Sequence, residues 1–340
     1  MEKMIVLYIF FNAVALLRGE SPPDFSVSLC EVVPPPSSAS VGIIDAKIWQ
    51  GQEERGVEDG PREIRRLGII DKIEDLGHEV NDYGAVDAGD ESFGKEQQAK
   101  YRQYYEFTER LKSMVEKSVE ENNFTVVLGG DHSLVYGAVS GSQPKGLIYV
   151  DAHSDINTPM TSCSDNIHGM PVAFLIKELA EYIPYHGQRV PPCLNANQVA
   201  YIALRDVDPL ERTILDEFNI RTYDMSAVDR LGIDAVVAEI LELLGDTDLH
   251  LSFDLDSLEP SITPCVGTPV LGGLTLREGI RIFELFKDKI IALDINEFNP
   301  RLAEKSGDCE RTGLTGIRLV EALLGLERRG PLTSQELPKP

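Results

Sequence analysis

Aspartate and histidine recur at short spacing in three segments of the chain. His132 lies within Gly-Gly-Asp-His-Ser, Asp151-Ala-His153-Ser-Asp155 forms a second segment, and Asp254-Leu-Asp256 forms a third. Alternate residues of an extended chain share one face, so the second and third segments each present their polar groups together. Carboxylates packed this closely repel each other, and divalent cations remove that conflict. The set suits two such ions, and its many carboxylates favour manganese or another fairly hard metal over zinc held by thiolates.

Paired ions can convert a shared water to hydroxide at neutral pH, so the pattern predicts a metal-dependent hydrolase. Each motif alone has a simpler interpretation. Asp131 or Ser133 could merely cap a helix, and Asp-x-Asp is usually a loop or a cap. The three motifs together favour the metal site.

Each motif directly follows a short apolar run, which predicts a buried strand. We expect strands at 41–45, 124–128, 146–150, 198–204, 220–223, 249–253 and 290–295. Ligands of open parallel sheets bind at the carboxyl ends of the strands. Asp294 and Glu297 follow the last of these runs, so four segments should bring acidic and imidazole groups to one edge of the sheet.

Helical patterns alternate with these strands. We expect helices at 62–76, 97–121, 133–140, 170–182, 209–218, 232–245, 276–288 and 313–326. Such alternation predicts an α/β fold with one mostly parallel sheet and helices on both sides. The catalytic domain should span 41–328, after a Pro/Ser-rich linker at 20–40 and before a disordered tail at 329–340.

The charge composition indicates which kinds of partner the protein can bind. The net charge of −24 would repel phosphate backbones, which argues against nucleic-acid binding.

The N-terminal run Met4–Phe11, followed by Ala13-Val-Ala15, resembles a secretory signal peptide and is too short to span a membrane. We therefore expect residues 1–19 to be a signal peptide of a secreted protein. The alternative is a buried strand or a disordered leader of a cytoplasmic protein.

The motifs resemble those of the ureohydrolases, and within them the arginases. The resemblance rests on Gly-Gly-Asp-His-Ser133, Asp151–Pro159, Asn166-Ile-His-Gly169 and Ser252–Pro260, and it runs from about residue 41 to 325. It implies a three-layer α/β/α fold, two Mn(II) ions per subunit, and hydrolysis of L-arginine to L-ornithine and urea, as in the urea cycle, by a hydroxide that bridges the two ions. The family's six metal ligands fall on the aspartates and histidines of the opening motifs: His132, Asp151, His153, Asp155, Asp254 and Asp256.

The resemblance also implies roles for other residues. His168 matches the proton-shuttling histidine, Glu297 matches the acid that holds the guanidinium, and Asp155 could accept a hydrogen bond from the nucleophile. The positions that would hold the substrate's amino-acid end or line the site nearby are Asn157, Ser162, Ser164, Asp208 and Thr268. A homotrimer is implied as well, with Arg277 and Arg311 at positions used between subunits.

Two alternatives remain open. An agmatinase shares the metal motifs, although Asn157, Ser164 and Asp208 favour a substrate with an α-carboxylate and an α-ammonium. A non-catalytic ureohydrolase-like binding protein should have lost metal ligands, which this chain retains. Three residues in the predicted rim of the site depart from the family pattern. The charge of Asp165 could weaken carboxylate binding, and Cys163 and Cys265 could form a redox-sensitive pair.

Overall fold

The computed structural model describes residues 38–94, 97–183, 190–326 and 328. The expected signal peptide, most of the linker and the tail from residue 329 lie outside the described residues. Within the described part, no helix combines the length and apolar character that crossing a membrane requires.

One eight-stranded sheet forms the centre of the fold, in the order β2-β1-β3-β8-β7-β4-β5-β6, and all neighbouring strands pair in parallel. The strands are β1 (Ser40–Lys47), β2 (Glu79–Asp87), β3 (Phe124–Gly129), β4 (Gly146–Val150), β5 (Val199–Leu204), β6 (Arg221–Asp224), β7 (Leu249–Asp254) and β8 (Ile290–Asn296). The inner strands β3, β4, β5 and β7 are buried along their whole length, as expected for strands covered on both faces.

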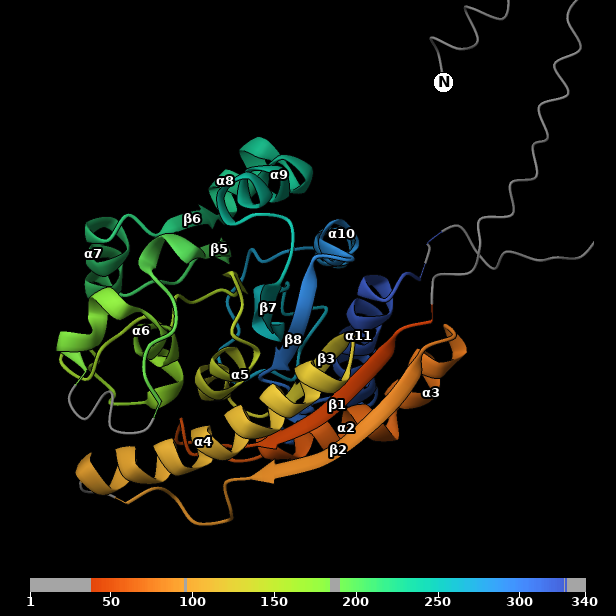
Figure 1. The fold of residues 1–340 in the computed structure, drawn as a ribbon, viewed down its shortest axis with the longest axis horizontal. Coiled ribbons are helices and arrows are strands. Elements are labelled where there is room, and N and C mark those ends of the chain that lie inside the picture. Colours follow the sequence, from red (N-terminus) through yellow and green to blue (C-terminus); the bar gives the residue numbers. More distant parts are fainter. Residues whose placement is uncertain (1–37, 95–96, 184–189, 327, 329–340) are drawn as a thin grey trace, which may run out of the picture. The chain divides into compact units, whose positions relative to one another are not determined.

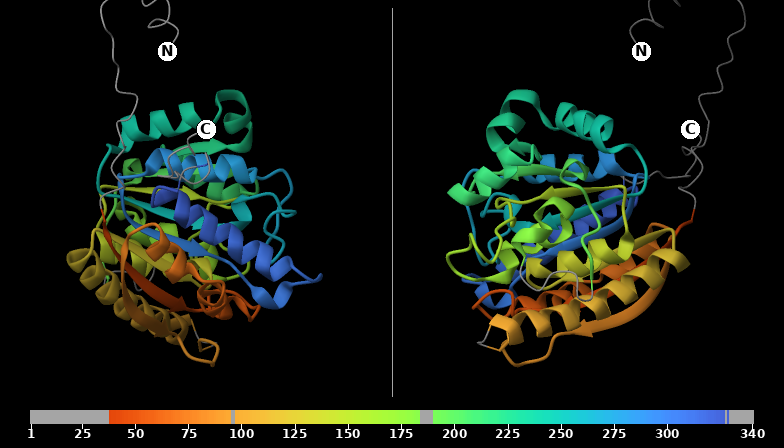
Figure 2. Two further views of the ribbon diagram at one scale, coloured as in Figure 1. Left: turned by 90° about the vertical axis from the view of Figure 1, so that its right-hand side faces the viewer. Right: turned by 60° about the vertical axis from the view of Figure 1, so that its left-hand side comes forward.

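Helices cover both faces of this sheet (Figures 1 and 2). They are α2 (Gly60–Arg66), α3 (Ile69–Asp75), α4 (Gln97–Glu121), α5 (Val135–Ser142), α6 (Pro171–Leu175), α7 (Pro209–Glu217), α8 (Met225–Leu231), α9 (Ile233–Leu244), α10 (Leu276–Phe286) and α11 (Asp308–Leu323). One apolar cluster joins α2, α3 and α8–α11 to the sheet, and a second joins α4–α7 to it. These two cores confirm the predicted three-layer α/β/α fold.

Some elements differ from the sequence-based expectation. The edge strand β2 was not predicted, because its residues are mostly polar and exposed and form no apolar run. The helix expected at 62–76 is two helices, separated at Gly68, whose φ of 90° is left-handed and ends a regular helix. The helix expected at 170–182 is α6 followed by a 3-10 helix at Lys177–Tyr182. Helix α8 was not expected.

The order of the central strands determines where the polar motifs meet. Strands β3, β8, β7, β4 and β5 are consecutive neighbours in the sheet. The segments after them carry His132, Glu297, Asp256, Asp151 and Asp208 respectively. Because all five strands point the same way, these side chains gather at one edge of the sheet.

Candidate metal centre and active site

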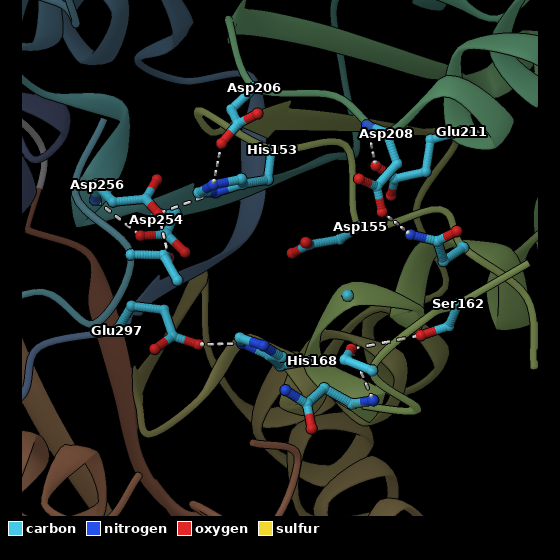
Figure 3. A pocket seen from close by; sticks show the side chains of 15 residues that line it. His153, Asp155, Ser162, His168, Asp206, Asp208, Glu211, Asp254, Asp256 and Glu297 are labelled. Carbon is cyan, nitrogen blue, oxygen red and sulfur yellow. Dashed lines mark hydrogen bonds and ion pairs between the residues drawn. The ribbon is translucent and has the colours of Figure 1, made fainter. Parts of the chain in front are cut away.

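A pocket opens at this edge of the sheet (Figure 3). Its lining consists of His153, Asp155, Asn157, Ser162, Ser164, Asn166, His168, Gly169, Asp206, Asp208, Glu211, Asp254, Asp256, Thr268 and Glu297. Every residue that we expected in the site is in this lining except His132 and Asp151. Those two are buried beside it, each only 1% exposed.

His132, Asp151 and Asp254 form the first candidate metal-binding group. His132 Nδ1 lies 2.9 Å from Asp151 Oδ2 and 3.1 Å from Asp254 Oδ2. Both His132 Nδ1 and Asp151 Oδ2 are buried without a hydrogen-bond partner within the described part of the chain. Buried polar atoms are normally paired, so these converging atoms fit a cation between them.

Asp151, His153 and Asp256 form a second group, which shares Asp151 with the first. His153 Nδ1 lies 3.1 Å from Asp256 Oδ2 and 3.4 Å from Asp151 Oδ1. Asp155 belongs to neither group, but its Oδ2 lies 3.4 Å from His132 Nδ1. The predicted ligands therefore form two adjoining groups around one shared carboxylate, with Asp155 beside them.

The negative charges of these buried carboxylates repel one another. Burial, followed by the charges of Asp256 and Asp151, holds the pKa of Asp254 well above its ordinary value. Burial and the charge of Asp151 raise the pKa of Asp155 to about 8. Divalent cations would relieve both effects, so the donor set fits two hard metal ions.

Gly130 allows the segment before His132 to run close to the backbone of Ile48. A Cβ on Gly130 would lie 2.0 Å from the carbonyl oxygen of Ile48, which leaves no room for a side chain. Asp131 then accepts hydrogen bonds from the backbone N–H of Ser133 at 3.0 Å and of Gly51 at 2.8 Å. Asp131 thus caps the turn, which is the simpler role considered for this motif in the sequence. The next residue, His132, belongs to the first candidate metal group.

A chain of buried hydrogen bonds orients the His132 ring through Nε2, the ring nitrogen that points away from the candidate metal groups. The Ser252 hydroxyl donates to Asp294 Oδ1 at 2.6 Å, and His132 Nε2 lies 2.8 Å from the same hydroxyl oxygen. His250 Nε2 lies 2.5 Å from Asp294 Oδ2. Because the Ser252 proton points to Asp294, its oxygen accepts from His132 Nε2–H. This leaves the Nδ1 lone pair directed at the carboxylates, as a metal ligand requires.

We therefore expect Ser252→Ala to weaken metal retention by about tenfold, since loss of such an outer hydrogen bond typically costs about 10- to 100-fold. Metal content after dialysis against graded concentrations of chelator measures this effect. Ser142→Ala is the matched control, because Ser142 contacts only the far end of the chain of hydrogen bonds, with its Oγ 2.8 Å from His250 Nδ1. Equal metal retention by the two variants would contradict the orienting role of Ser252.

Tyr149 also contacts two of these residues, and the sequence did not indicate it. Its ring stacks on His132 with centroids 4.5 Å apart and planes 11° apart. Its hydroxyl donates to Asp155 Oδ2 at 2.6 Å. Tyr149 thus fixes both the plane of one candidate ligand and the carboxylate of Asp155, whose backbone has a left-handed φ of 47°.

Glu297 faces the pocket from the end of β8, opposite His168 in Figure 3. Its φ of 64° is left-handed, an uncommon conformation for glutamate that often marks functional sites. The backbone N–H of His132 donates to Oε1 at 2.7 Å, and Gln52 Nε2 donates to Oε2 at 3.0 Å. The carboxylate is therefore fixed in orientation, and Gln52 is a further contributor that the sequence did not indicate.

His168 and Glu297 influence each other's ionisation. Nδ1 of His168 lies 3.5 Å from Glu297 Oε1. Burial alone would lower the pKa of His168, but the hydrogen bond and charge of Glu297 raise it to about 9. Burial raises the pKa of Glu297, yet its contact with His168 holds it below its ordinary value. The contact thus favours a protonated His168 beside an ionised Glu297.

The residues expected to hold the amino-acid end of a substrate lie on the pocket rim. Asn157 Nδ2 donates to Asp208 Oδ2 at 3.1 Å, and the hydroxyls of Ser162 and Ser164 lie 3.5 Å apart. Thr268 also lines the pocket, but its hydroxyl donates to Asp256 Oδ2 at 3.1 Å, so its contact is with a candidate metal ligand. These side chains offer neutral donors and acidic acceptors.

The two cysteines that were expected in rim loops differ in accessibility, and neither lines the pocket. Cys163 is exposed and Cys265 is fully buried, and both are free thiols in this structure. The redox-sensitive pair remains an untested prediction.

Known proteins are similar to this chain in sequence and in fold. The model of the Arginase family matches residues 39–325. Human Arginase-1 is 43% identical over 306 residues, which cover 86% of this chain and 95% of that protein. The crystal structure of arginase from Bacillus subtilis aligns with a TM-score of 0.75 at 35% identity, over 85% of this chain and 99% of that one. An Entamoeba histolytica arginase solved in complex with L-ornithine aligns with a TM-score of 0.74 at 26% identity, over 86% of this chain and 100% of that one. The chain therefore belongs to the arginase family.

Proposed function

We propose that this protein hydrolyses L-arginine to L-ornithine and urea at a pair of divalent metal ions. One observation carries the proposal: two candidate metal groups share Asp151, and the buried carboxylate of Glu297 lines the same pocket. The likeness to arginases over most of the chain supports it, as does the similarity to the Entamoeba histolytica arginase, which was solved in complex with L-ornithine.

His132, Asp151, His153, Asp254 and Asp256 would hold the two ions, with Asp155 beside them. Guanidinium is a poor electrophile, and paired divalent ions supply a strong nucleophile from water at neutral pH. Their shared ligand, Asp151, would keep the two sites close together.

Glu297 would bind the substrate's guanidinium group. A fixed carboxylate offers two acceptors in the plane of the guanidinium, which makes the contact bidentate and directional. The hydrogen bonds from His132 N–H and Gln52 set that plane in advance. The substrate's reacting carbon would thereby lie next to Asp155 and the candidate metal groups.

His168 would transfer a proton to the departing amine. Its side chain is 20% exposed, so its ring can exchange protons with solvent. A guanidinium bound to Glu297 would offset that carboxylate's charge and would lower the pKa of His168 from about 9 towards neutrality. An imidazole in that range can release its proton during turnover.

Urea release tests the proposal directly. The manganese-loaded protein should release urea from L-arginine and far less from agmatine, because a site with donors for an α-carboxylate and an α-ammonium rejects an analogue that lacks them. Preferential hydrolysis of agmatine would instead identify an agmatinase. No urea from either substrate, with metal bound, would favour a binding protein without this activity.

We also propose Mn(II) as the metal, a homotrimer as the assembly and secretion as the destination. The carboxylate-rich ligand set supports manganese. Arg277 is exposed and Arg311 is half exposed, at positions that the family resemblance places between subunits. The apolar run near the N-terminus supports secretion. Metal analysis, light scattering and N-terminal sequencing of the mature protein test these statements separately.

A further inference from the structure

An ion pair joins helix α4 to the loop that carries Ser162 and Ser164. Lys100 Nζ lies 3.1 Å from Asp165 Oδ2 and also donates a hydrogen bond to the carbonyl oxygen of Asp165. The Lys100 side chain is 17% exposed and that of Asp165 is 50% exposed. The lysine therefore reaches the loop from a different element, along a partly covered path, and touches both the side chain and the backbone of Asp165.

Asp165 lies between the rim residues of the pocket. Its backbone N–H donates to Ser162 Oγ at 3.0 Å, and the next N–H, of Asn166, donates to Ser164 Oγ at 3.2 Å. The φ of Asp165 is 60°, a left-handed conformation that aspartate and asparagine tolerate better than most residues. The conformation at Asp165 therefore sets the orientation of both serine hydroxyls.

The electrostatics of the rim are unfavourable for an anion. Among the described lining residues there is no lysine or arginine, and Asp206 and Asp208 are acidic. A substrate carboxylate on this rim must depend on neutral donors such as Ser162 and Ser164. An uncompensated charge on Asp165, adjacent to Ser164, would repel that carboxylate.

We propose that Lys100 is a positioning residue for the substrate's α-carboxylate. It cancels the charge of Asp165 and fixes the loop conformation that presents the two serine hydroxyls. The inference rests on the proposed function, because it assumes a substrate with an α-carboxylate. It explains how this chain accommodates aspartate at a position where a negative charge would otherwise weaken binding.

Lys100→Met tests this role in the manganese-loaded, full-length protein. We expect the KM for L-arginine and the inhibition constant of L-ornithine to rise about three- to tenfold, as for one nearby unit charge at a partly solvated site. The kcat should stay within about twofold, since Lys100 touches none of the groups that bind metal or guanidinium. The effect should shrink at high salt, which screens a half-exposed charge. The inhibition constant of putrescine, which lacks the carboxylate, should not rise.

Asp165→Asn in the Lys100→Met background should return the KM to within about twofold of the parent, because asparagine removes the charge and tolerates the left-handed φ. Lys100→Gln, which keeps a polar side chain but loses the charge, should raise the KM as Lys100→Met does. Lys112→Met is the matched control, because Lys112 lies on the same helix and pairs with Glu116 at 2.9 Å, outside the pocket lining.

Three results would overturn the inference: an unchanged KM in Lys100→Met, a raised KM that Asp165→Asn does not reverse, or an equal loss of affinity for putrescine. Each presupposes that the parent protein hydrolyses L-arginine. A parent protein that binds manganese and yet releases no urea would contradict the proposed function instead, so the two failures are distinguishable.

Discussion

Asp151→Asn should reduce urea production by about a thousandfold or more and should lower the metal content of the protein. Asp151 is the carboxylate that the two candidate metal groups share, and it is 1% exposed. Its oxygens lie 2.9 Å from His132 Nδ1 and 3.4 Å from His153 Nδ1. Removing its charge weakens both sites at once, and loss of paired-metal catalysis costs several kcal/mol of transition-state stabilisation.

Metal analysis after gel filtration, together with the rate of urea release, measures this effect. Asp206→Asn is the comparison variant, because Asp206 also faces His153, but at 3.8 Å and with its side chain 68% exposed. We expect that variant to lose about tenfold or less. An Asp151→Asn protein that keeps two ions and near-parental activity would contradict the shared-ligand arrangement.

Glu297→Gln should lower kcat/KM for L-arginine by about a hundredfold or more without reducing metal content. Removing one charge from a buried, hydrogen-bonded ion pair costs about 2–5 kcal/mol, and the new amide also directs a donor at the guanidinium. Glu297 is 4% exposed and receives hydrogen bonds from His132 N–H and Gln52 Nε2. Its substitution therefore affects the substrate directly and leaves the metal groups in place.

Inhibition by L-ornithine separates this effect from general damage, because ornithine lacks the guanidinium and should bind the variant about as well as the parent. Glu259→Gln is a suitable control, since Glu259 accepts from the backbone N–H groups of Gly272 and Gly273 and does not line the pocket. Equal kcat/KM in Glu297→Gln and the parent would remove Glu297 from substrate binding.

Much of the fold could be predicted because the inner strands are covered on both faces. Strands such as Phe124–Gly129 and Val199–Leu204 are near-continuous apolar runs, which a single sequence reveals directly. Strand β2 lies at the sheet edge and is mostly exposed, so its polar residues carry no such signal. The break at Gly68 depends on one left-handed residue within an otherwise helical pattern.

The candidate ligands could be predicted for a related reason: they directly follow strands, and parallel strands end at one edge of the sheet. The residues that support these ligands from the side away from the pocket could not be predicted, because their contacts depend on which strands are neighbours in the sheet. Ser252 and Asp294 are paired across β7 and β8, and only the strand order brings them together behind His132. One signal was present: His250, Ser252 and Asp254 are polar residues at alternate positions of a strand whose other residues are apolar. Lys100 and Asp165 meet only through the packing of α4 beside the pocket loop.

Manganese titration of the metal-free protein shows whether catalysis needs both candidate metal groups. We expect urea release from L-arginine to be negligible without metal, to rise with added Mn(II), and to reach its maximum at two bound ions per chain. Maximal activity with one bound ion, or full activity after complete removal of metal, would contradict the paired-metal centre around Asp151.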